Sequence, residues 1–510
     1  MLTAGAATLA RGLGGPARAQ VQASVIRYDA TSTGGKAMLR IYADAVRAMM
    51  AKDPGDPLSW TFQWFIHAIP DNTTKAAELD RVFPHPSAAR TLAEATWSTC
   101  EPHFSGEEDN FLPWHRMYTA HFEAIVRAVT NRPDFTLPYW NYTGASPARA
   151  LPPEFLKPGD PVWGSLYRPD RGSDAKAGRP VDTNGPDPIT LNAMKSITYS
   201  GGRGDAGFCA NLDGDPHGSI HDDVGNDVGM GAVPWAANDP IFWLHHCNID
   251  RIWASWNKVG GKNLADPGFL AQSFPLVGPD GLRSDTKVRA VMDTSQLHYL
   301  YDRYLLRPPG SRPFPPAPQP ARLNALPRVM LAPPPAPGAG APSEPIRLGA
   351  QPVTVTLPGP PVAVLAPPPP RVQSPGAGAP GAQSPRPLLR SGPPPAPRTV
   401  HLRLIGLQSD APVGGGYDVY LNLPAGQAPT RQSPAYVGTV SFFGTSQHHD
   451  QQAMAGMSMP MGRTVSFELS PEAGRAAEAS SERNITFAPT RAVNTASAPP
   501  ARPRAHRRRP

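Results

Sequence analysis

The apolar positions between residues 24 and 306 repeat with the spacing of amphipathic helices. Lys36–Met50 carries its apolar side chains on one face, and Tyr118–Thr130 and Pro240–Trp256 show the same period. Connectors rich in proline and glycine separate these segments, and no strand pattern alternates with them. We therefore predict a mainly α fold, a helical bundle with long, irregular loops.

After residue 399 the period changes, and apolar residues alternate with polar ones in four short segments. These segments are Val400–Leu407, Tyr417–Leu423, Tyr436–Phe443 and Arg463–Leu469. Turn residues bound each of them. Together they predict a small C-terminal antiparallel β domain, built as one sheet or as a sandwich.

Proline separates the two patterns. Of the 66 prolines, thirty lie between Pro308 and Pro397. Because proline lacks a backbone N–H and breaks helices, this stretch cannot form a helix or a central strand. The predicted units are an export-signal remnant (1–20), a helical domain (21–307), a linker rich in Pro, Ala and Gly (308–398), a β domain (399–471) and a disordered basic tail (472–510).

The charge balance argues against a nucleic-acid-binding domain. The chain has 48 Lys and Arg residues against 41 Asp and Glu residues, a formal charge of +7. Six of the arginines lie in residues 491–510, which contain no acidic residue, so the remainder is close to neutral. The basic tail over Arg502–Arg509 is expected to be solvated, with contact to anionic surfaces as the alternative.

The N-terminus favours a periplasmic or secreted location. Ala17-Arg18-Ala19 precedes Gln20 and resembles the cleavage site of an export signal, although Arg11 interrupts the apolar stretch before it. A disordered N-terminal extension is the alternative. No run of about 18 apolar residues occurs, so we predict no membrane span.

Several of the 14 histidines occupy positions that suit a metal site. His217 and His221 are four residues apart, so on a helix both imidazoles would lie on one face and could converge on one metal ion. Two surface histidines are the alternative. A helix that opens near Pro240 would also place His246 and Asp250 on one face. His115 begins another predicted helix, and His103 precedes it by twelve residues; His67 ends an aromatic segment.

Two longer motifs resemble the copper-binding signatures of the tyrosinase family, which comprises tyrosinases, catechol oxidases and related polyphenol oxidases, with molluscan haemocyanins as relatives. The first is Phe111-Leu-Pro-Trp-His115-Arg116, followed by Glu123. The second is Asp239-Pro-x-Phe242-Trp-x-x-His246-x-x-x-Asp250. The resemblance covers roughly residues 25–306 and, more loosely, the C-terminal strands. It implies a four-helix bundle that holds two copper ions, with dioxygen as co-substrate.

The resemblance also implies a ligand set. It assigns one copper to His67, His103 and His115, and the other to His217, His221 and His246. Neutral imidazole suits copper, and three nitrogens for each ion leave open positions for dioxygen. In the second signature the ligand is the later histidine of the pair, hence His246 rather than His245. The choice of His103 rests on Cys100-Glu-Pro-His103, which resembles one bacterial branch; His85 and His121 are the alternatives.

The three cysteines are too few for a disulfide framework. Some relatives carry a thioether between a cysteine and the second ligand of the first copper, but nothing at Cys100 requires one. A Cys100–Cys209 disulfide and buried free thiols are the alternatives.

Residues after the second-copper ligands bear on the substrate. Family members that hydroxylate monophenols often have an asparagine after the first ligand, which helps a glutamate hold a water; here that position is Gly218, and Asp222 follows the second ligand. No glutamate occurs between residues 154 and 344. Asp213 or Asp215 could replace it as a base, or both could line a loop. We predict oxidation of o-diphenols and o-aminophenols to o-quinone-type products, with weaker monophenol hydroxylation.

Other residues of the signatures have expected roles. By resemblance Phe242 overhangs the second copper and stacks on or gates the substrate ring, and Val233 lines the entrance. The charged residues are expected to form buried ion pairs that fix the helices, since a buried charge needs a partner. They are Arg116, Glu123, Asp250 and Arg251, with Asn248 in the same network.

The C-terminal strands resemble the small β domain that follows the catalytic domain in plant and some bacterial polyphenol oxidases. There it covers the copper site and is often removed, so we predict a latent proenzyme with a cleavable linker; a constitutive second domain is the alternative. A loop over 448–461 carries His448, His449, Met454, Met457, Met459 and Met461. Because thioether sulfur selects Cu(I), these residues predict copper capture, with a flexible Met-rich loop as the alternative.

The competing functions are a full tyrosinase with strong monophenol hydroxylation, a reversible oxygen carrier and a non-enzymatic copper-binding protein. The single helical domain argues against the carrier, and the two complete signatures argue against simple copper binding.

Overall fold

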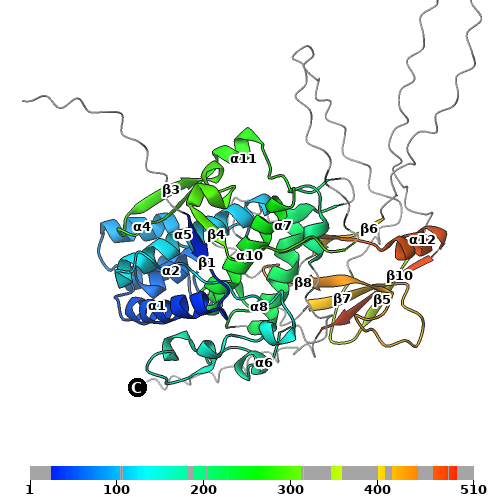
Figure 1. Ribbon diagram of the computed structural model, residues 1–510, viewed down its shortest axis with the longest axis horizontal. Helices are drawn as coiled ribbons and strands as arrows, with labels where there is room; N and C mark the ends of the chain where they lie inside the picture. Colours follow the sequence, from blue (N-terminus) through cyan, green and yellow to red (C-terminus); the bar gives the residue numbers. More distant parts are fainter. Residues whose placement is uncertain are drawn as a thin grey trace, which may run out of the picture.

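The computed structural model describes residues 24–103, 105, 107–181, 189, 191–202, 205–226, 228–309, 311, 314, 346–358, 400–407, 416–445, 463–480 and 482–490. In this part of the chain a helical body and a C-terminal β unit lie side by side (Figure 1). The predicted export signal, the Met-rich loop 448–461 and the tail after residue 490 lie outside the described residues.

Helices build the body between residues 24 and 306. The α-helices are α1 (Thr33–Met50), α2 (Trp60–His67), α3 (Lys75–Val82), α4 (Ala88–Thr96), α5 (Phe111–Thr130), α6 (Ser173–Lys176), α7 (Gly207–Leu212), α8 (Ser219–Val224), α9 (Val233–Ala236), α10 (Ile241–Lys258) and α11 (Pro267–Ala271). Short 3-10 helices are η1 (Glu108–Asn110), η2 (Ser146–Arg149), η3 (Pro153–Leu156), η4 (Gly164–Leu166), η5 (Asn192–Lys195), η7 (Val288–Ala290) and η8 (Thr294–Leu297); η6 (Asp213–Gly218) is π-helical. The three predicted helices are confirmed as α1, α5 and α10, although α5 begins at Phe111.

Local capping explains where the helices that carry histidines begin. The Ser59 side chain accepts a hydrogen bond from the Phe62 N–H at 3.1 Å at the start of α2. At the start of α10, Asp239 Oδ1 accepts from the Ile241 N–H at 3.0 Å. Both oxygens of the same carboxylate accept from Arg171 at 2.7 Å, so a buried bidentate ion pair holds this helix start in place.

Short strands close the helical body on itself. β1 (Val25–Arg27) pairs in parallel with β4 (Tyr299–Tyr301), which brings the two ends of the body together. β2 (Ser273–Val277) and β3 (Arg283–Lys287) form an antiparallel hairpin. The segment from residue 25 to 301 is therefore one closed unit.

The C-terminal unit is antiparallel, as predicted. β6 (His401–Leu407), β7 (Gly416–Leu421), β8 (Tyr436–Ser441) and β9 (Arg463–Glu468) match the four expected segments. Two further strands, β5 (Val353–Pro358) and β10 (Glu482–Pro489), complete a sheet of order β5-β10-β7-β8, while β6 pairs with β9. Helix α12 (Pro471–Ala479) precedes β10.

Two predicted boundaries are therefore wrong. β5 lies inside the predicted linker, and it occupies the edge of the sheet, where a strand bounded by proline is tolerated. β10 lies inside the tail predicted to be disordered. Ile485 and Phe487 of β10 are buried in the core of the sheet, where they pair with Leu421 and Val419 of β7. The Ala, Ser and Arg residues around the strand hide this alternation in the composition.

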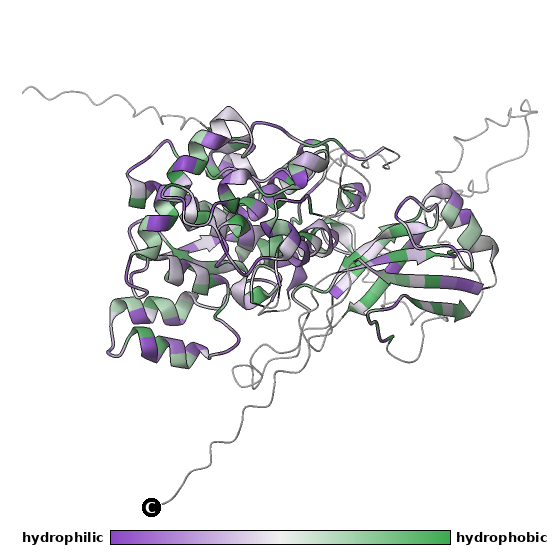
Figure 2. Cartoon of the chain, turned by 90° about the horizontal axis from the view of Figure 1, so that it is seen from below, coloured by the Kyte–Doolittle hydropathy of each residue, from purple (hydrophilic) through white to green (hydrophobic). Residues whose placement is uncertain are grey.

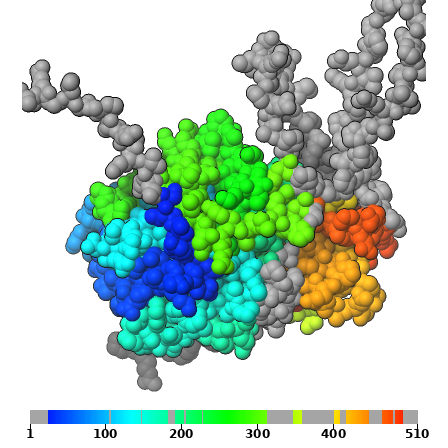
Figure 3. All heavy atoms as spheres, in the orientation of Figure 1, coloured from blue at the N-terminus to red at the C-terminus, as the bar shows by residue number. Residues whose placement is uncertain are grey.

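Each unit has its own apolar core, but one side chain of the β unit is buried in the core of the helical body. The helices share one buried cluster, and β7, β8, β9, β10 and α12 share another. Hydrophobic positions, coloured green in Figure 2, occur along the elements of both units. Phe443 follows β8, yet its side chain is buried in the helical cluster. β8 contacts η6 and α8, and β9 contacts α7, so the β unit lies against the helical body (Figure 3).

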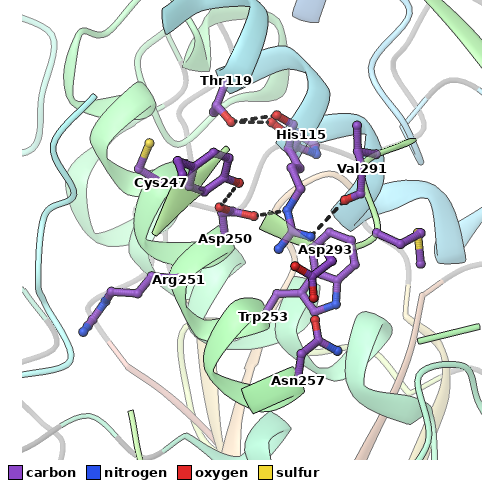
Figure 4. A network of polar contacts seen from close by, with 12 residues as sticks. His115, Thr119, Cys247, Asp250, Arg251, Trp253, Asn257, Val291 and Asp293 are labelled. Atoms are coloured by element: carbon purple, nitrogen blue, oxygen red, sulfur yellow. Dashed lines mark hydrogen bonds and ion pairs between the residues drawn. The ribbon is translucent and has the colours of Figure 1, made fainter. Parts of the chain in front are cut away.

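A buried carboxylate ties the elements of the body together (Figure 4). Asp250 on α10 accepts hydrogen bonds from Arg116 on α5, from Tyr299 at 2.6 Å and from Tyr301 at 2.5 Å on β4. Arg27 on β1 lies 3.4 Å from the same carboxylate. The Arg116 side chain also donates to the Val291 carbonyl at 2.9 Å, and its guanidinium stacks on Trp253.

The other charged residues of the signatures are also buried and partnered, as expected. Glu123 accepts from Arg27 at 2.9 Å and from Arg127. Arg251 donates to Asn248 at 2.9 Å and to Asn141 at 2.7 Å. These contacts fix helices rather than line the histidine cluster.

We expect Asp250→Ala to lower the free energy of unfolding of the metal-free chain by about 3–5 kcal/mol, because it leaves buried cations without their partner. Denaturant unfolding followed by tryptophan fluorescence measures this. The matched control is Asp134→Ala, whose carboxylate pairs with Arg132 on the exposed surface and should leave stability nearly unchanged. Equal losses for both variants would contradict the role given to Asp250.

Candidate metal centre

Three histidines from the first part of the helical body form one group. His67 is the last residue of α2, His115 lies in the first turns of α5, and His103 lies in the loop before η1. The His67 ring centroid lies 6.0 Å from that of His103 and 5.9 Å from that of His115. These residues are the set expected at the first copper.

A second group comes from later elements. His217 lies in η6, His221 in α8 and His246 in α10. The His217 ring centroid lies 4.7 Å from that of His221 and 5.1 Å from that of His246. Asp215 has extended backbone angles and interrupts the helix just before His217, but the two histidines still share a face.

The two groups meet in one cluster. The rings of His115 and His246 are stacked, with centroids 4.2 Å apart and planes within 5°. The His115 ring also lies 6.1 Å from that of His217. α5 and α10, which carry the stacked pair, are the two helices joined by Arg116 and Asp250.

Backbone carbonyls orient four of the imidazoles. The Nδ1 atoms lie within hydrogen-bond distance of main-chain oxygens: His67 with Val233 (3.1 Å), His115 with Phe111 (2.8 Å), His217 with Asp213 (3.1 Å) and His221 with Met230 (2.7 Å). A ring that donates through Nδ1 keeps the lone pair of Nε2 for a metal. The buried Nε2 atoms of His103, His217, His221 and His246 have no hydrogen-bond partner among the described residues.

Burial favours the neutral form of five of these imidazoles. It lowers the pKa of His115 to about 3, and it lowers the pKa values of His67, His103, His221 and His246 well below the ordinary value. Neutral imidazole is the form that binds metal. Six imidazole donors in two groups of three fit two copper ions.

Comparison with known proteins identifies the fold and the family. The common central domain of tyrosinase matches residues 57–173 and 181–259. These segments contain all six histidines. The helical body therefore contains the central domain of the tyrosinase and polyphenol oxidase family. The family implies a dicopper centre, and the donor set fits it.

Two curated relatives show how far the likeness extends. A tyrosinase of Hahella sp. is 32% identical over 51% of this chain and 59% of its own length. A chloroplastic polyphenol oxidase of Malus domestica is 30% identical over 40% of this chain and 39% of its own. The chain thus spans between two and three fifths of the length of these relatives.

The fold is shared over nearly the whole chain. The structure of latent apple tyrosinase superposes with a TM-score of 0.58 over 92% of this chain and 95% of that one, at 22% identity. Among the described residues of the present chain, no helix is both long enough and apolar enough to cross a membrane.

The structure adds one histidine that the motifs left aside. His245 is fully buried, and its donor atoms lie within 4.8 Å of those of His217, His221 and His246. Neither ring nitrogen has a hydrogen-bond partner among the described residues. The alternatives to His103 lie elsewhere: His85 is exposed, and His121 is bonded to Val277 and Thr286 of the β2–β3 hairpin.

The three cysteines are free and buried. The expected alternative of a Cys100–Cys209 disulfide is therefore not formed, because the two thiols point to different partners. Cys100 Sγ lies 3.5 Å from Nε2 of His115, and Cys209 Sγ lies 3.4 Å from the carbonyl oxygen of Glu108. Burial raises the pKa of both thiols.

The two apolar residues assigned to the substrate site border the cluster. The Phe242 ring centroid lies 4.2 Å from that of His246 and 5.0 Å from that of His67. Val233 is buried, and its carbonyl orients His67. Gly218 directly follows His217 in the chain, and it too is buried.

The carboxylates near the second group differ in their surroundings. Asp213 is buried, with Oδ1 2.9 Å from His217 Nδ1 and Oδ2 3.1 Å from Arg463 of β9. Burial would raise its pKa, but Arg463 and His217 hold it below the ordinary value. Asp215 accepts from Ser219 at 2.7 Å, and Asp222 accepts from Ser441 of β8 at 2.7 Å.

The β unit reaches the cluster through one aromatic side chain. The Phe443 ring is stacked on His221, with centroids 3.9 Å apart and planes within 10°. It also lies 5.5 Å from His217 and 5.9 Å from His103. Ser441, Phe443 and Arg463 were not singled out from the sequence, because only the packing of β8 and β9 onto η6 and α8 brings them to the site.

We expect the metal-free chain to bind two copper ions and His221→Ala to bind one, because the variant leaves only the first group complete. Elemental analysis after equilibrium dialysis against limiting copper measures the ratio. His121→Gln is the control, since His121 faces the β2–β3 hairpin and should leave two ions bound. Two tightly bound ions in His221→Ala would contradict the assignment.

Proposed function

We propose that the chain is a dicopper oxidoreductase that oxidises o-diphenols to o-quinones with dioxygen. Two diphenols then give two quinones and two waters for each dioxygen consumed. The observation that carries the proposal is the stack of His115 on His246, which joins two groups of three imidazoles. We assign His67, His103 and His115 to one copper and His217, His221 and His246 to the other.

The bound copper pair would supply the binding and reduction of dioxygen, and the protein groups would position it. The carbonyls of Val233, Phe111, Asp213 and Met230 hold four ligand rings in the tautomer that leaves Nε2 free. Phe242 gives the second group an apolar wall against which a substrate ring can stack.

The carboxylates favour diphenols over monophenols as substrates. Asp213 is engaged by both Arg463 and His217, so we assign it to orienting His217 rather than to removing a phenol proton. Diphenol oxidation makes a smaller demand on a base, because the catechol hydroxyl is already present. A full tyrosinase is the second candidate, supported by the match to the Hahella tyrosinase.

The C-terminal unit is proposed to keep the enzyme latent. Phe443 lies flat on His221 in the space where a substrate ring would approach the second copper. Polar contacts hold the unit in place: Ser441 donates to Asp222 at 2.7 Å, and Ser466 donates to Asp205 at 2.9 Å. Arg463 adds a buried ion pair with Asp213. We call the described residues of this unit, 346–358, 400–407, 416–445, 463–480 and 482–490, the lid.

The pairing of β5 with β10 decides where cleavage would release the lid. A cut after β5 leaves that strand attached to the helical body and still paired with β10. The whole sheet separates if the chain is cut before β5, for example in the segment that contains Arg322 and Arg328. Trypsin cleavage at these arginines, confirmed by mass spectrometry, defines the nicked enzyme.

We expect the copper-loaded, nicked enzyme to take up oxygen rapidly with a catechol, and to show a long lag or little uptake with the matching monophenol. An oxygen electrode records both, and the metal-free chain is the control. Fast hydroxylation of the monophenol would favour the full tyrosinase. No uptake with either substrate, despite two bound coppers, would favour an oxygen carrier and contradict the proposal.

We expect Phe443→Ala to raise the catechol oxidase activity of the intact chain roughly tenfold or more, because about 1.4 kcal/mol of lost lid contact changes the open population tenfold. The control is Ile405→Ala, on β6 of the same lid, whose side chain is 72% exposed. Each rate is divided by that of the nicked form. An unchanged ratio for Phe443→Ala would remove Phe443 from the latency mechanism.

A further inference from the structure

Gly218 has no conformational reason to be glycine. Its backbone angles are φ −61° and ψ −41°, in the ordinary helical region that alanine adopts more readily than glycine. It is followed by α8, so a side chain here would support the helix. The reason for glycine must therefore lie in what surrounds the residue.

The lid occupies the space that a side chain at position 218 would need. A β-carbon added to Gly218 would lie 2.5 Å from Ser441 Oγ and 2.8 Å from Ser441 Cβ. Turning the Ser441 hydroxyl away relieves only the first contact, because its Cβ is fixed to the β8 backbone. Ser441 is buried, and its Oγ donates to Asp222 and accepts from the Phe443 N–H at 3.0 Å.

Two other glycines mark the same interface. A β-carbon on Gly214, four residues before Gly218, would lie 3.0 Å from Val465 Cγ2 of β9. A β-carbon on Gly444 of the lid would lie 2.7 Å from Nδ1 of His103. The lid thus packs tightly against the helical body on both sides of Phe443, and of the two helical-body glycines Gly218 would make the shorter contacts with it.

We propose that Gly218 couples lid closure to the shape of the substrate site. Because it follows His217, a side chain at this position projects into the space beside His217 and His221 that Ser441 fills when the lid is closed. After the lid leaves, the same space belongs to the substrate. A side chain at position 218 that changes the shape of the substrate site would therefore also prevent β8 from docking. Latency of this chain thus requires glycine at position 218. This inference rests on the proposed latent oxidase.

The test is a double-mutant cycle in the copper-loaded full chain. It compares the wild type, Gly218→Ala, Ser441→Gly and the double variant. For each, the catechol oxidation rate of the intact chain is divided by that of its own nicked form, which removes any direct effect of residue 218 on turnover. Gly218→Ala should raise the ratio roughly tenfold, equivalent to about 1.4 kcal/mol of lid docking. The double variant should return most of the way to the ratio of Ser441→Gly, because removing the serine side chain makes room for the new methyl group.

Hydrogen exchange gives a second readout that does not depend on turnover. Gly218→Ala should speed amide exchange in the peptides that cover β8 and Phe443, and the double variant should restore protection. Gly202→Ala is the matched control, since a β-carbon there meets no atom within 4 Å and should change neither readout.

Two outcomes overturn the coupling. One is a Gly218→Ala chain with the wild-type ratio and wild-type exchange, and the other is a double variant that stays as open as Gly218→Ala. If no variant oxidises catechol although two coppers are bound, the oxidase proposal fails, and the exchange rates still decide whether residue 218 controls lid docking.

Discussion

The ion pair between Asp250 and Arg116 sets the spacing of the two central helices, and the histidine cluster depends on it. Arg116 directly follows His115 on α5, and Asp250 lies one turn after His246 on α10. The pair therefore acts at the level of the stacked rings. Leaving either charge unpaired in the interior costs several kcal/mol. This makes the separation of α5 and α10 hard to change, as a site that must hold two metal ions at a set distance requires.

A second chain of contacts links the ligands to the lid. His217 rests on Asp213, and Asp213 is also the partner of Arg463 from β9. The residue that orients a ligand on one side thus anchors the lid on the other. Phe443 extends the link into apolar packing, because its ring is buried among the helices rather than in the sheet. The same contacts therefore hold the lid closed and fix the positions of the second group of histidines.

The helical part was predictable because its information is local. The periodic segments appear as α1, α5 and α10, and the two signatures supply His115 and His246 of the cluster. His103 depended on a short resemblance and His245 on none, because a loop residue and a neighbouring helix position have no periodic signal. β10 was missed for another reason: its alternation is short, and the composition around it resembles that of a tail. Phe443, Ser441 and Arg463 belong to strands that sequence predicts, but their contact with His221, Gly218 and Asp213 is a tertiary event.

The position of β10 has a consequence for the order of events during synthesis. It is the last described strand in the sequence, yet it lies between β5 and β7 in the sheet. Domains made first on the ribosome generally fold first. Until residues 482–489 emerge, β5 has no neighbour among the described strands and one side of β7 is open. The helical body can therefore form its histidine cluster, open to metal ions from solution, before the sheet that covers it can be completed. The strands that meet in the sheet are therefore far apart in the sequence, and β5 gains its partner only when residues 482–489 have been made.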